Sequence, residues 1–324
     1  MKIFIKCVVF LLMLTGLTIG IINYLFGPVE KMNKEEIIAI PENLKNSDVI
    51  NKLKDQKLIK NTEVFIWLLN TFGKGRTIIS GGYKLNKNMY VWQILQKILG
   101  SPDLIWIVIP EGIRKEQIGE ILSEKLKWNN NEMTKWNEAY ADTKPDYIEG
   151  VYYPDTYLIP KDEKGNDIVV RMINRFNEKM DPLLTDFAVK NIKWTTGVKI
   201  ASLIQREAAG SQDMPLISGI IWNRLEQGMK LQIDATMQYT KGKINNKWWG
   251  TIDLTEKTVD SPYNTYLYKG LPPTPICNPG IIAIEAALNP QDTDCLYYLH
   301  DENKQIHCAK TYEQHKININ KYLL

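Results

Sequence analysis

Residues 7 to 29 read CVVFLLMLTGLTIGIINYLFGPV, a run of 23 residues without a charged side chain. A helix of about 20 apolar residues is long enough to span the hydrocarbon core of a membrane. Lys2 and Lys6 precede the run, so the positive-inside rule keeps the short N-terminus in the cytoplasm and places the chain from about residue 30 outside. We therefore expect residues 1 to 28 to form a cytoplasmic N-terminus and a single-pass transmembrane anchor.

The alternative interpretation of this run is a cleaved signal peptide. Cleavage needs a small-x-small site just after the apolar stretch. Here Ile-Ile-Asn-Tyr-Leu-Phe occupies residues 21 to 26, and the next alanine is Ala39. The absence of a cleavage site favours a retained anchor.

The composition of the whole chain is that of a globular protein. Of its 324 residues, 44% are hydrophobic and 24% are charged, and the formal net charge is +3. These values exclude disordered, collagen-like and disulfide-dense proteins, and the length predicts two or more domains. A charge of +3 provides no basic stripe, and most of the chain lies outside the cytoplasm, so we expect no nucleic-acid partner.

The four cysteines do not organise the fold. Cys7 lies in the expected anchor, so Cys277, Cys295 and Cys308 can form at most one internal disulfide and must leave one thiol. A metal site would have to gather cysteines and histidines whose spacing matches no CxxC or HExxH pattern. We expect no metal and no cofactor. The side chains considered for the metal site are Cys295, His300, His307, Cys308 and His315.

An internal repeat follows the anchor. Residues 40 to 44 (IPENL) and 109 to 113 (IPEGI) are 69 residues apart, and Val49 and Leu53 match Ile118 and Leu122 at the same offset. Each copy predicts a strand, a proline turn and an amphipathic helix. Between the copies, residues 81 to 85 predict a strand and 91 to 98 a helix. We expect small βα modules here in place of one large sheet.

Helical patterns dominate the second half. Apolar residues recur at helical spacing in segments 168–181 and 195–209. A third helix, 213–227, has Asp213 and Pro215 at its start and Gly228 after its end, the usual start and stop signals. Residues 281–288 predict a fourth, and the polar segment 160–167 a linker or hairpin tip. The fold class is therefore α+β, with a mostly helical second half.

One acid lies on an apolar stripe. Glu207 follows Ile200, Leu203 and Ile204 at i, i+3, i+4 and i+7, so it shares a helix face with them. Burial raises the pKa of a carboxyl group, and a carboxylic acid that is still protonated near neutrality can cleave a glycosidic bond as a general acid. The alternative is structural: the carboxylate pairs with Arg224 or lies at the rim of the stripe.

Five motifs in order then resemble the endolytic murein transglycosylase family called MltG or YceG. The family patterns are A-S-[IL]-[IV]-x-[KR]-E, N-R-L, G-M-x-L-Q-x-D, Y-N-T-Y and G-L-P-P-x-P-I-x-N-P-G. The matching segments here are 201–207 (ASLIQRE), 223–225 (NRL), 228–234 (GMKLQID), 263–266 (YNTY) and 270–280 (GLPPTPICNPG). The resemblance covers nearly the whole chain, including the anchor, the I-P-E-G turn and the segment 149–157.

The resemblance implies a function and a division of the chain. It implies that Glu207 is the catalytic acid of a lyase that cuts the β-1,4 bond between N-acetylmuramic acid and N-acetylglucosamine and leaves 1,6-anhydro ends. It further implies LysM-like glycan-binding modules over residues 29–160 and a catalytic domain over 161–324. Family members are bacterial inner-membrane proteins whose C-terminal domain faces the periplasm. Peptidoglycan strands are the expected substrate, peptidoglycan synthases are candidate partners, and the enzyme would terminate glycan elongation.

Other side chains are candidates for holding the sugar. Amide, hydroxyl and guanidinium groups can bind N-acetyl, hydroxyl and carboxylate groups, although each can equally serve the fold. Asp213 and Asp234 are possible second acids, and we expect neither to be essential. Trp248-Trp249 is a candidate for stacking on sugar rings or for packing, and residues 271–275 for a rigid cleft wall. The candidate substrate-binding residues are Asn223, Arg224, Gln232, Asp234, Tyr263 and Asn264.

The chain departs from the family near its end. The family pattern is H-x-F-A-K-T, whereas residues 306–311 read IHCAKT, so we assign no catalytic role to His307. A second hypothesis is a non-catalytic, membrane-anchored scaffold that binds glycan through the LysM-like modules. In such a scaffold Glu207 would be dispensable.

Overall fold

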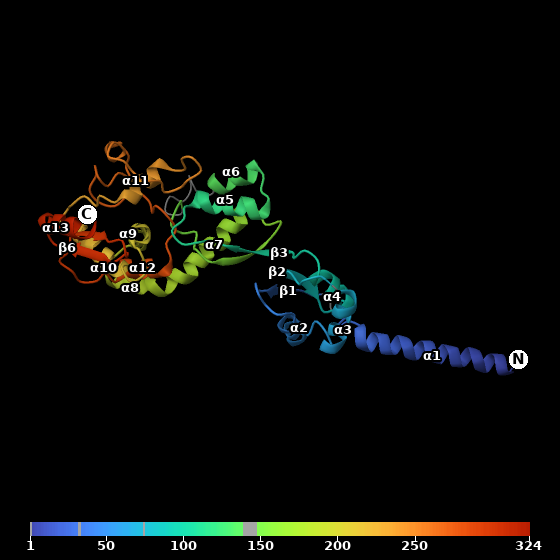
Figure 1. Ribbon diagram of the computed structural model, residues 1–324. Coiled ribbons are helices and arrows are strands. Elements are labelled where there is room, and N and C mark those ends of the chain that lie inside the picture. The colour runs from blue at the N-terminus through green and yellow to red at the C-terminus, as the bar shows by residue number, and fades with distance from the viewer. Residues whose placement is uncertain (1, 32–33, 74, 139–147) are drawn as a thin grey trace. The chain divides into compact units, whose positions relative to one another are not determined.

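The computed structural model describes residues 2–31, 34–73, 75–138 and 148–324 (Figure 1). The chain divides into two compact units. Unit 1 comprises Met1–Ile107 and Thr156–Glu163, and unit 2 comprises Val108–Asp155 and Lys164–Leu324. By packing, residues 108–155 therefore group with the C-terminal half. The division by function, with glycan binding in residues 29–160 and catalysis in residues 161–324, stays a prediction.

The N-terminal run forms helix α1 (Lys2–Phe26). Its segment Phe4–Phe26 is long and apolar enough to cross a membrane, and its apolar side chains are exposed. The C-terminal end of α1 contacts helix α3 (Thr62–Phe72), where the rings of Phe26 and Trp67 meet edge to face with centroids 6.2 Å apart. Nearby, Nζ of Lys60 donates a 3.1 Å hydrogen bond to the Asn23 carbonyl. The apolar side chains from Phe4 to Tyr24 are exposed for most of the helix, which suits an apolar surrounding, as the sequence predicts.

Unit 1 is built on one four-stranded sheet. The strands β1 (Glu35–Ile40), β2 (Gly81–Asn86), β3 (Leu104–Val108) and β4 (Thr156–Pro160) lie in this order, and β1–β2 and β2–β3 are antiparallel. Helices α2 (Asn46–Asp55), α3 and α4 (Val91–Ile98) contribute to one core with the first two strands. The predicted strand at 81–85 and helix at 91–98 are confirmed.

The internal repeat is confirmed as two strand–turn–helix units, β1–α2 and β3–α5 (Lys115–Leu126). The matched residues Val49, Leu53, Ile118 and Leu122 are all buried. The sheets are small, as expected, and the two copies share one of them, because β1 and β3 are both strands of the four-stranded sheet. The helices pack differently: α2 belongs to unit 1, and α5 packs in unit 2 against α6 (Asn130–Glu138).

A glycine on α5 explains how this helix packs against α6. Gly119 lies on α5 where the first copy has Ile50, and a Cβ atom there would lie 2.6 Å from Cδ1 of Trp136. The glycine thus admits the buried indole of Trp136, which donates a 2.9 Å hydrogen bond to the Lys115 carbonyl.

Unit 2 is mostly helical, as predicted. The predicted helices 168–181, 195–209, 213–227 and 281–288 are α7 (Gly165–Met180), α9 (Trp194–Glu207), α10 (Met214–Glu226) and α12 (Ile281–Leu288). Helix α9 packs against α10 and α12, and also contacts α8 (Leu184–Val189) and α11 (Asp234–Lys241). Short 3₁₀ turns lie at Asp181–Leu183 and Glu256–Thr258.

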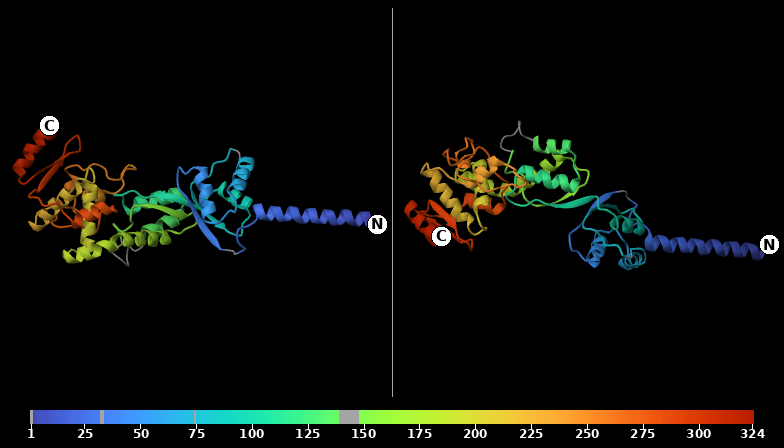
Figure 2. Two further views of the ribbon diagram at one scale, coloured as in Figure 1. Left: turned by 90° about the horizontal axis from the view of Figure 1, so that it is seen from below. Right: turned by 45° about the horizontal axis from the view of Figure 1, so that its top comes forward.

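The chain ends in a hairpin and a helix. Strands β5 (Tyr297–His300) and β6 (Ile306–Ala309) pair antiparallel, and α13 (Tyr312–Tyr322) packs against both, as the red segments in Figure 2 show. A disulfide joins Cys295, just before β5, to Cys308 in β6. Cys277 remains a buried thiol. The predicted limit of one disulfide and one remaining thiol outside the anchor is thus met.

Candidate active site

Glu207 is the last residue of α9 and lies half-buried at the end of its apolar stripe. Ile200, Leu203 and Ile204, which share its helix face, are fully buried. Oε2 of Glu207 accepts a 2.6 Å hydrogen bond from the hydroxyl of Tyr298 on β5. Periodicity thus places the acid correctly, and its partner comes from a strand 91 residues further along the chain.

The surroundings raise the pKa of Glu207 above its ordinary value. Burial, which penalises the charged form, is the largest cause, and the nearby Asp234 carboxylate acts in the same direction. The Tyr298 hydrogen bond and the charges of His300 and Arg206 lower the pKa. Because burial outweighs them, the carboxyl group keeps its proton to a higher pH than an exposed glutamate does, as a general acid requires.

The structural alternative paired Glu207 with Arg224, but the guanidinium has other partners. Nε of Arg224 donates to the Leu296 carbonyl and Nη1 to the Leu231 carbonyl, both at 2.6 Å. Within the described parts of the chain, no ion pair involves Glu207. The acid is therefore held by a neutral hydroxyl.

The hairpin supplies a second group, His300, that the sequence does not single out for this site. Tyr298 and His300 are two positions apart on β5, so their side chains lie on the same face of the strand. Their ring centroids are 6.0 Å apart. Nε2 of His300 lies 3.1 Å from Oδ2 of Asp213, the N-cap residue of α10. One sequence signal, the period-2 spacing of two polar aromatic side chains in a short strand, could have indicated this pair.

Asp234 lies exposed at the start of α11. Its Oδ1 accepts a hydrogen bond from the Tyr266 hydroxyl and lies 3.0 Å from Nζ of Lys257. The same Nζ donates to the Tyr266 hydroxyl at 3.0 Å. Burial, followed by the bond to Asp234, raises the pKa of Tyr266 to about 12. The structure therefore joins the predicted Asp234 to two residues that the sequence analysis missed.

Gln232 precedes this cluster in a left-handed backbone conformation, with φ of +52°. That conformation is uncommon for residues other than glycine. The backbone here is fixed by Thr265, whose carbonyl accepts from the Gln232 N–H at 3.1 Å and whose hydroxyl accepts from the Ile233 N–H at 2.9 Å. The sharp turn leaves the Gln232 side chain exposed two residues before Asp234.

Three other candidates bind the protein's own groups. The Asn223 amide donates to the carbonyls of Thr293 and Cys295. The buried Asn264 amide donates to the carbonyls of Lys257 and Val259. Tyr263 and Thr274 share a 2.8 Å hydrogen bond between their hydroxyls. These contacts fix the loops around Glu207 and Asp234, and a substrate-binding role for the three side chains stays a prediction.

The Trp248-Trp249 pair is anchored to α5. The Trp248 indole N–H donates to Glu120 and the Trp249 indole N–H to Gln117. The guanidinium of Arg206 lies 4.0 Å from the Trp249 ring centroid, and that of Arg114 lies 5.0 Å from the Trp248 ring centroid. Cations therefore contact both rings, which favours packing over stacking on sugar.

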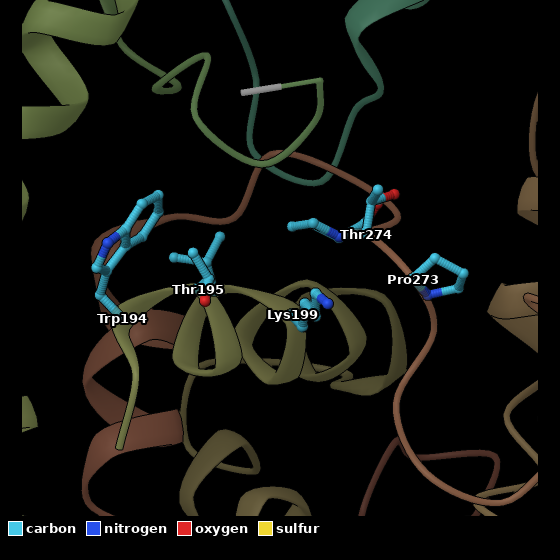
Figure 3. A pocket seen from close by; sticks show the side chains of 7 residues that line it. Trp194, Thr195, Lys199, Pro273 and Thr274 are labelled. Carbon is cyan, nitrogen blue, oxygen red and sulfur yellow. The ribbon is translucent and has the colours of Figure 1, made fainter. Parts of the chain in front are cut away.

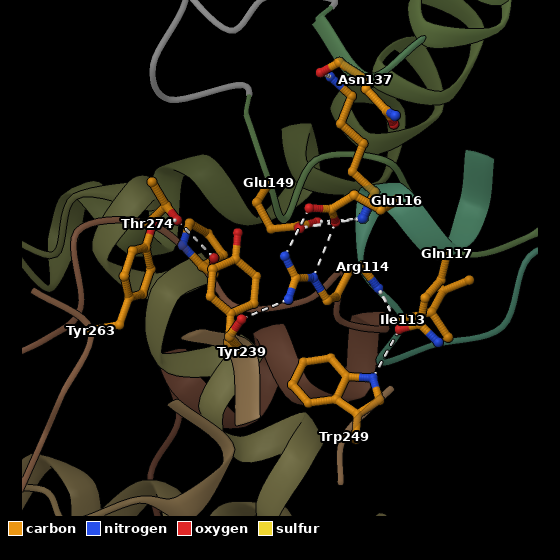
Figure 4. Close-up of polar contacts among 12 residues, drawn as sticks. Ile113, Arg114, Glu116, Gln117, Asn137, Glu149, Tyr239, Trp249, Tyr263 and Thr274 are labelled. Atoms are coloured by element: carbon orange, nitrogen blue, oxygen red, sulfur yellow. Dashed lines mark hydrogen bonds and ion pairs between the residues drawn. The ribbon is translucent and has the colours of Figure 1, made fainter. Parts of the chain in front are cut away.

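Arg114 connects this anchored loop to α11. Its guanidinium pairs with Glu116, donates a 2.7 Å hydrogen bond to the Tyr239 carbonyl and lies 4.0 Å from the Tyr239 ring centroid (Figure 4). The Tyr239 and Tyr263 rings are in contact, with centroids 4.9 Å apart. The segment after the second repeat turn thus supports the loops that carry the candidate site residues.

A second buried acid, Glu149, lies in the same unit and is absent from the sequence-based candidates. Its Oε1 accepts hydrogen bonds from the backbone N–H of Lys115 at 3.1 Å and from the side-chain amide of Asn278 at 2.7 Å. Burial is the main cause that raises the pKa of Glu149 to about 8. Figure 4 shows Glu149 beside Arg114 and Glu116. Its described hydrogen bonds link the start of α5 to the N-P-G turn at Asn278, which indicates a structural role.

Among the hollows that the described residues of unit 2 form, two lie beside α9 and α10, and neither of these is lined by Glu207. The first, between the start of α9 and residues 273–275, has a volume of about 20 Å³ (Figure 3). That space holds a water molecule but no sugar ring. The predicted proline wall therefore packs close against Trp194, Thr195 and Lys199. The second hollow, of about 500 Å³, lies between α10 and residues 288–293 and includes Trp222 and Asn223.

The histidines near the C-terminus do not converge. His307 lies 2.9 Å from Asp301 and stacks on Tyr322, whereas His315 stacks on Tyr297. Among the residues that the structure describes, no three histidine, cysteine, aspartate or glutamate side chains are grouped to hold a metal ion. The disulfide uses two of the cysteines that a metal site would have needed.

Comparisons with known proteins find relatives that match most of the chain. An endolytic murein transglycosylase of Bacillus subtilis is 29% identical over 322 residues, which cover 92% of this chain and 88% of the relative. One from Streptococcus pneumoniae is 25% identical over 90% of this chain, which spans only 59% of that longer relative. A crystal structure of a yceG-like protein from Listeria monocytogenes is 26% identical, with a TM-score of 0.60 over 89% of this chain and 100% of that chain.

A family profile also matches most of the sequence. The description of the matching profile is "YceG-like family", and the match runs from residue 38 to residue 321. The resemblance predicted from the five ordered motifs is confirmed, and the chain belongs to the YceG-like family.

Proposed function

We propose that this protein is a membrane-anchored endolytic murein transglycosylase in which Glu207 is the catalytic acid and base. The observation that carries the proposal is the environment of Glu207: a half-buried carboxyl group with a raised pKa, held by one neutral hydroxyl and free of any ion pair within the described residues. Family membership supports it, because the relatives in Bacillus subtilis and Streptococcus pneumoniae are named endolytic murein transglycosylases.

The reaction needs one proton-transferring residue. Protonated Glu207 gives its proton to the bridging oxygen of the β-1,4 bond as the bond from that oxygen to C1 of N-acetylmuramic acid breaks. The resulting carboxylate then takes the proton from the C6 hydroxyl of the same sugar as O6 bonds to C1. The products are a free N-acetylglucosamine hydroxyl and a 1,6-anhydro end. Glu207 regains its proton, and no water is consumed.

The other acids near Glu207 have partners of their own. Asp213 lies against His300, and Asp234 is bound by Tyr266 and Lys257. An ordinary glycosidase would need a second carboxylate as nucleophile or base. The contacts of Asp213 and Asp234 support our hypothesis that neither acid has that role.

Helix α1 supports a proposal for the location. We propose that Phe4–Phe26 is a retained single-pass anchor in the bacterial inner membrane and that the rest of the chain faces the periplasm. There it would meet newly made glycan strands, act beside peptidoglycan synthases and terminate strand elongation. Residues 29–160 would bind glycan, and residues 161–324 would cut it.

The decisive experiment is product analysis with the full-length protein in detergent. Purified glycan strands are incubated with wild type, Glu207→Gln and the matched control Glu226→Gln, whose side chain is exposed on α10. We expect fragments with anhydro ends from wild type and the control, and none from Glu207→Gln. Hydrated ends, heavier by one water, would contradict the transglycosylase mechanism. Strand binding without any cleavage by wild type would support the scaffold.

A further inference from the structure

We propose that Tyr298 is a positioning residue for the reaction. Its hydroxyl donates a hydrogen bond to Oε2 of Glu207 whether Glu207 is neutral or ionised, and Oε1 is therefore the oxygen that gives and takes the proton. This inference rests on the proposed role of Glu207. It concerns a residue outside the motifs that identify the family in this sequence, and it follows from how the β5–β6 hairpin meets the end of α9.

The geometry separates the two oxygens of the carboxyl group. Oε2 of Glu207 accepts the 2.6 Å hydrogen bond from Tyr298. In the described parts of the chain, no hydrogen bond or ion pair reaches Oε1. One oxygen therefore has a fixed donor, and the other is left for an incoming group.

The direction of the hydrogen bond is set by the acidity of the phenol. Burial, and then the charge of Glu207, raise the pKa of the Tyr298 hydroxyl well above its ordinary value. The phenol therefore keeps its proton and remains a donor. A donor can bond to a carboxylate oxygen or to the carbonyl oxygen of a neutral carboxylic acid. It disfavours a proton on Oε2, because a protonated carboxyl oxygen is a weaker acceptor than a carbonyl oxygen, so the proton of neutral Glu207 belongs on Oε1.

The strand holds this donor rigidly in place. Tyr298 pairs with Cys308 across the hairpin, and the disulfide from Cys308 to Cys295 closes the chain around it. Asn223 binds the carbonyl of Cys295, and Arg224 binds that of Leu296, so α10 fixes the two residues that lead into β5. A preorganised donor of this kind costs no reordering when the carboxyl group changes charge.

Several charged groups surround the pair and would share control of its titration. His300 on β5 and Arg206 on α9 favour the carboxylate, whereas Asp234 on α11 disfavours it. Other titratable groups act on His300, on Asp234 or on Tyr298. They are Arg224 on α10, Tyr266 in the following loop, Asp213 against His300, and Lys257 against Asp234.

The test uses Tyr298→Phe, which removes one hydroxyl and keeps the ring. Tyr297→Phe is the matched control, because Tyr297 lies on the same strand, where its ring packs against Tyr312 and His315. Loss of a hydrogen bond to a charged group predicts a fall in kcat of roughly ten- to hundredfold for Tyr298→Phe. KM should stay within about twofold, since the hydroxyl touches no substrate in this scheme.

The pH profile separates positioning from mere stability. The hydrogen bond lowers the pKa of Glu207, so its loss should raise that pKa and move the alkaline limb of kcat to higher pH. Tyr297→Phe should leave the limb in place. A Tyr298→Phe enzyme whose activity falls only with its folded fraction, with the limb unmoved, would overturn the proposal.

A second measurement is independent of activity. Carbon-13 NMR titration of the Glu207 carboxyl, assigned by its loss in Glu207→Gln, reports the pKa directly in wild type and Tyr298→Phe. We expect a higher pKa in Tyr298→Phe even if the wild-type protein cuts no glycan, a result that would refute the proposed function and leave the hydrogen-bond role intact. Equal pKa values in the two proteins would refute the role of Tyr298 itself.

Discussion

The side-chain amide of Asn278 donates a 2.7 Å hydrogen bond to Oε1 of Glu149, although the two residues are 129 positions apart in the chain. The same Asn278 also bonds to the backbone of both neighbouring segments: it donates to the Ile113 carbonyl and accepts from the Tyr152 N–H. Asn278 therefore joins the I-P-E-G turn, the segment 149–157 and the N-P-G turn before α12. The three motifs are together because they share one buried polar network.

The first prediction concerns the pH dependence of stability through Glu149. The folded-state pKa is about 8, against an ordinary value of 4.5. Between these values the folded protein binds more protons than the unfolded chain, so stability falls as pH rises through this window. Glu149→Gln should remove this loss, which amounts to at most about 1.4 kcal/mol per pH unit. Urea unfolding at pH 5.5, 6.5 and 7.5 measures the difference in slope between the two proteins.

Lys115, whose backbone N–H binds Glu149, affects stability in a separate pH range. Burial lowers its pKa to about 8, so its contribution changes above pH 8 and has the opposite sign: stability is gained as pH rises toward the ordinary value of 10.5. This gain should be larger in Glu149→Gln than in wild type, because the charge of Glu149 raises the pKa of Lys115. Parallel stability curves for wild type and Glu149→Gln between pH 5.5 and 7.5 would contradict the assignment.

The second prediction concerns Asp234, whose negative charge raises the pKa of Glu207. Asp234→Asn removes the charge and leaves the Lys257 ammonium without its carboxylate, and both changes favour ionised Glu207. The alkaline limb of kcat should therefore move to lower pH, opposite to the shift expected for Tyr298→Phe. The anhydro product should persist, because Asp234 is no nucleophile in the proposed mechanism.

Asp260→Asn is the control for Asp234→Asn, because Asp260 also accepts a hydrogen bond from a tyrosine, at 2.7 Å from Tyr268, and is exposed. It should leave the limb unchanged. Complete loss of cleavage in Asp234→Asn with a normal fold would show instead that Asp234 takes part in the chemistry.

The sequence predicts those parts of the site whose residues are close together in the chain. The stripe through Ile200, Leu203 and Ile204 fixes the face of α9 on which Glu207 lies, because helix periodicity is a local property. Likewise, Asp213 and Gly228 mark the ends of α10 to within a residue or two. The period-2 spacing of Tyr298 and His300 can relate these two residues to each other, but it cannot assign them to the site, because the contact between a distant hairpin and α9 is tertiary.

The candidate substrate-binding residues show the same limit, because their type alone does not decide their partners. Asn223 and Arg224 have suitable groups for a sugar, but the structure turns them toward the carbonyls of residues 293–296. Residue type indicates what a side chain can bind, and only the fold decides which partner it meets. Glu149 is missed for a related reason: its burial arises from three segments that close over it, and no stripe in its own segment predicts it.

The third prediction concerns Gly219 on α10. A Cβ atom at this position would lie 2.2 Å from the backbone carbonyl oxygen of Gln291. Alanine should stabilise the helix by about 1 kcal/mol through propensity, but the clash with backbone should cost more, for a net loss of about 1 to 3 kcal/mol. Because residues 291–296 lead into β5, the displaced segment should also lower kcat. Thermal and urea unfolding together with glycan cleavage measure both effects.

Gly210→Ala is the control for Gly219→Ala. Gly210 is exposed, and a Cβ atom there would have no neighbour within 4 Å. Its stability should change by less than about 0.5 kcal/mol. Equal stability of the two variants would show that the contact between α10 and Gln291 is loose.

The last prediction concerns the disulfide that closes the hairpin. Cys295 and Cys308 are 13 residues apart, and a loop of that length stabilises the folded protein by about 3 kcal/mol, mainly through the unfolded chain. Cys295→Ala with Cys308→Ala should therefore lower the urea midpoint, and kcat should fall because the strand that carries Tyr298 is less firmly held. Cys277→Ala is the control, since its buried thiol is outside the disulfide. If the double variant unfolds earlier but keeps its full kcat in the folded state, then α10 alone holds Tyr298 against Glu207.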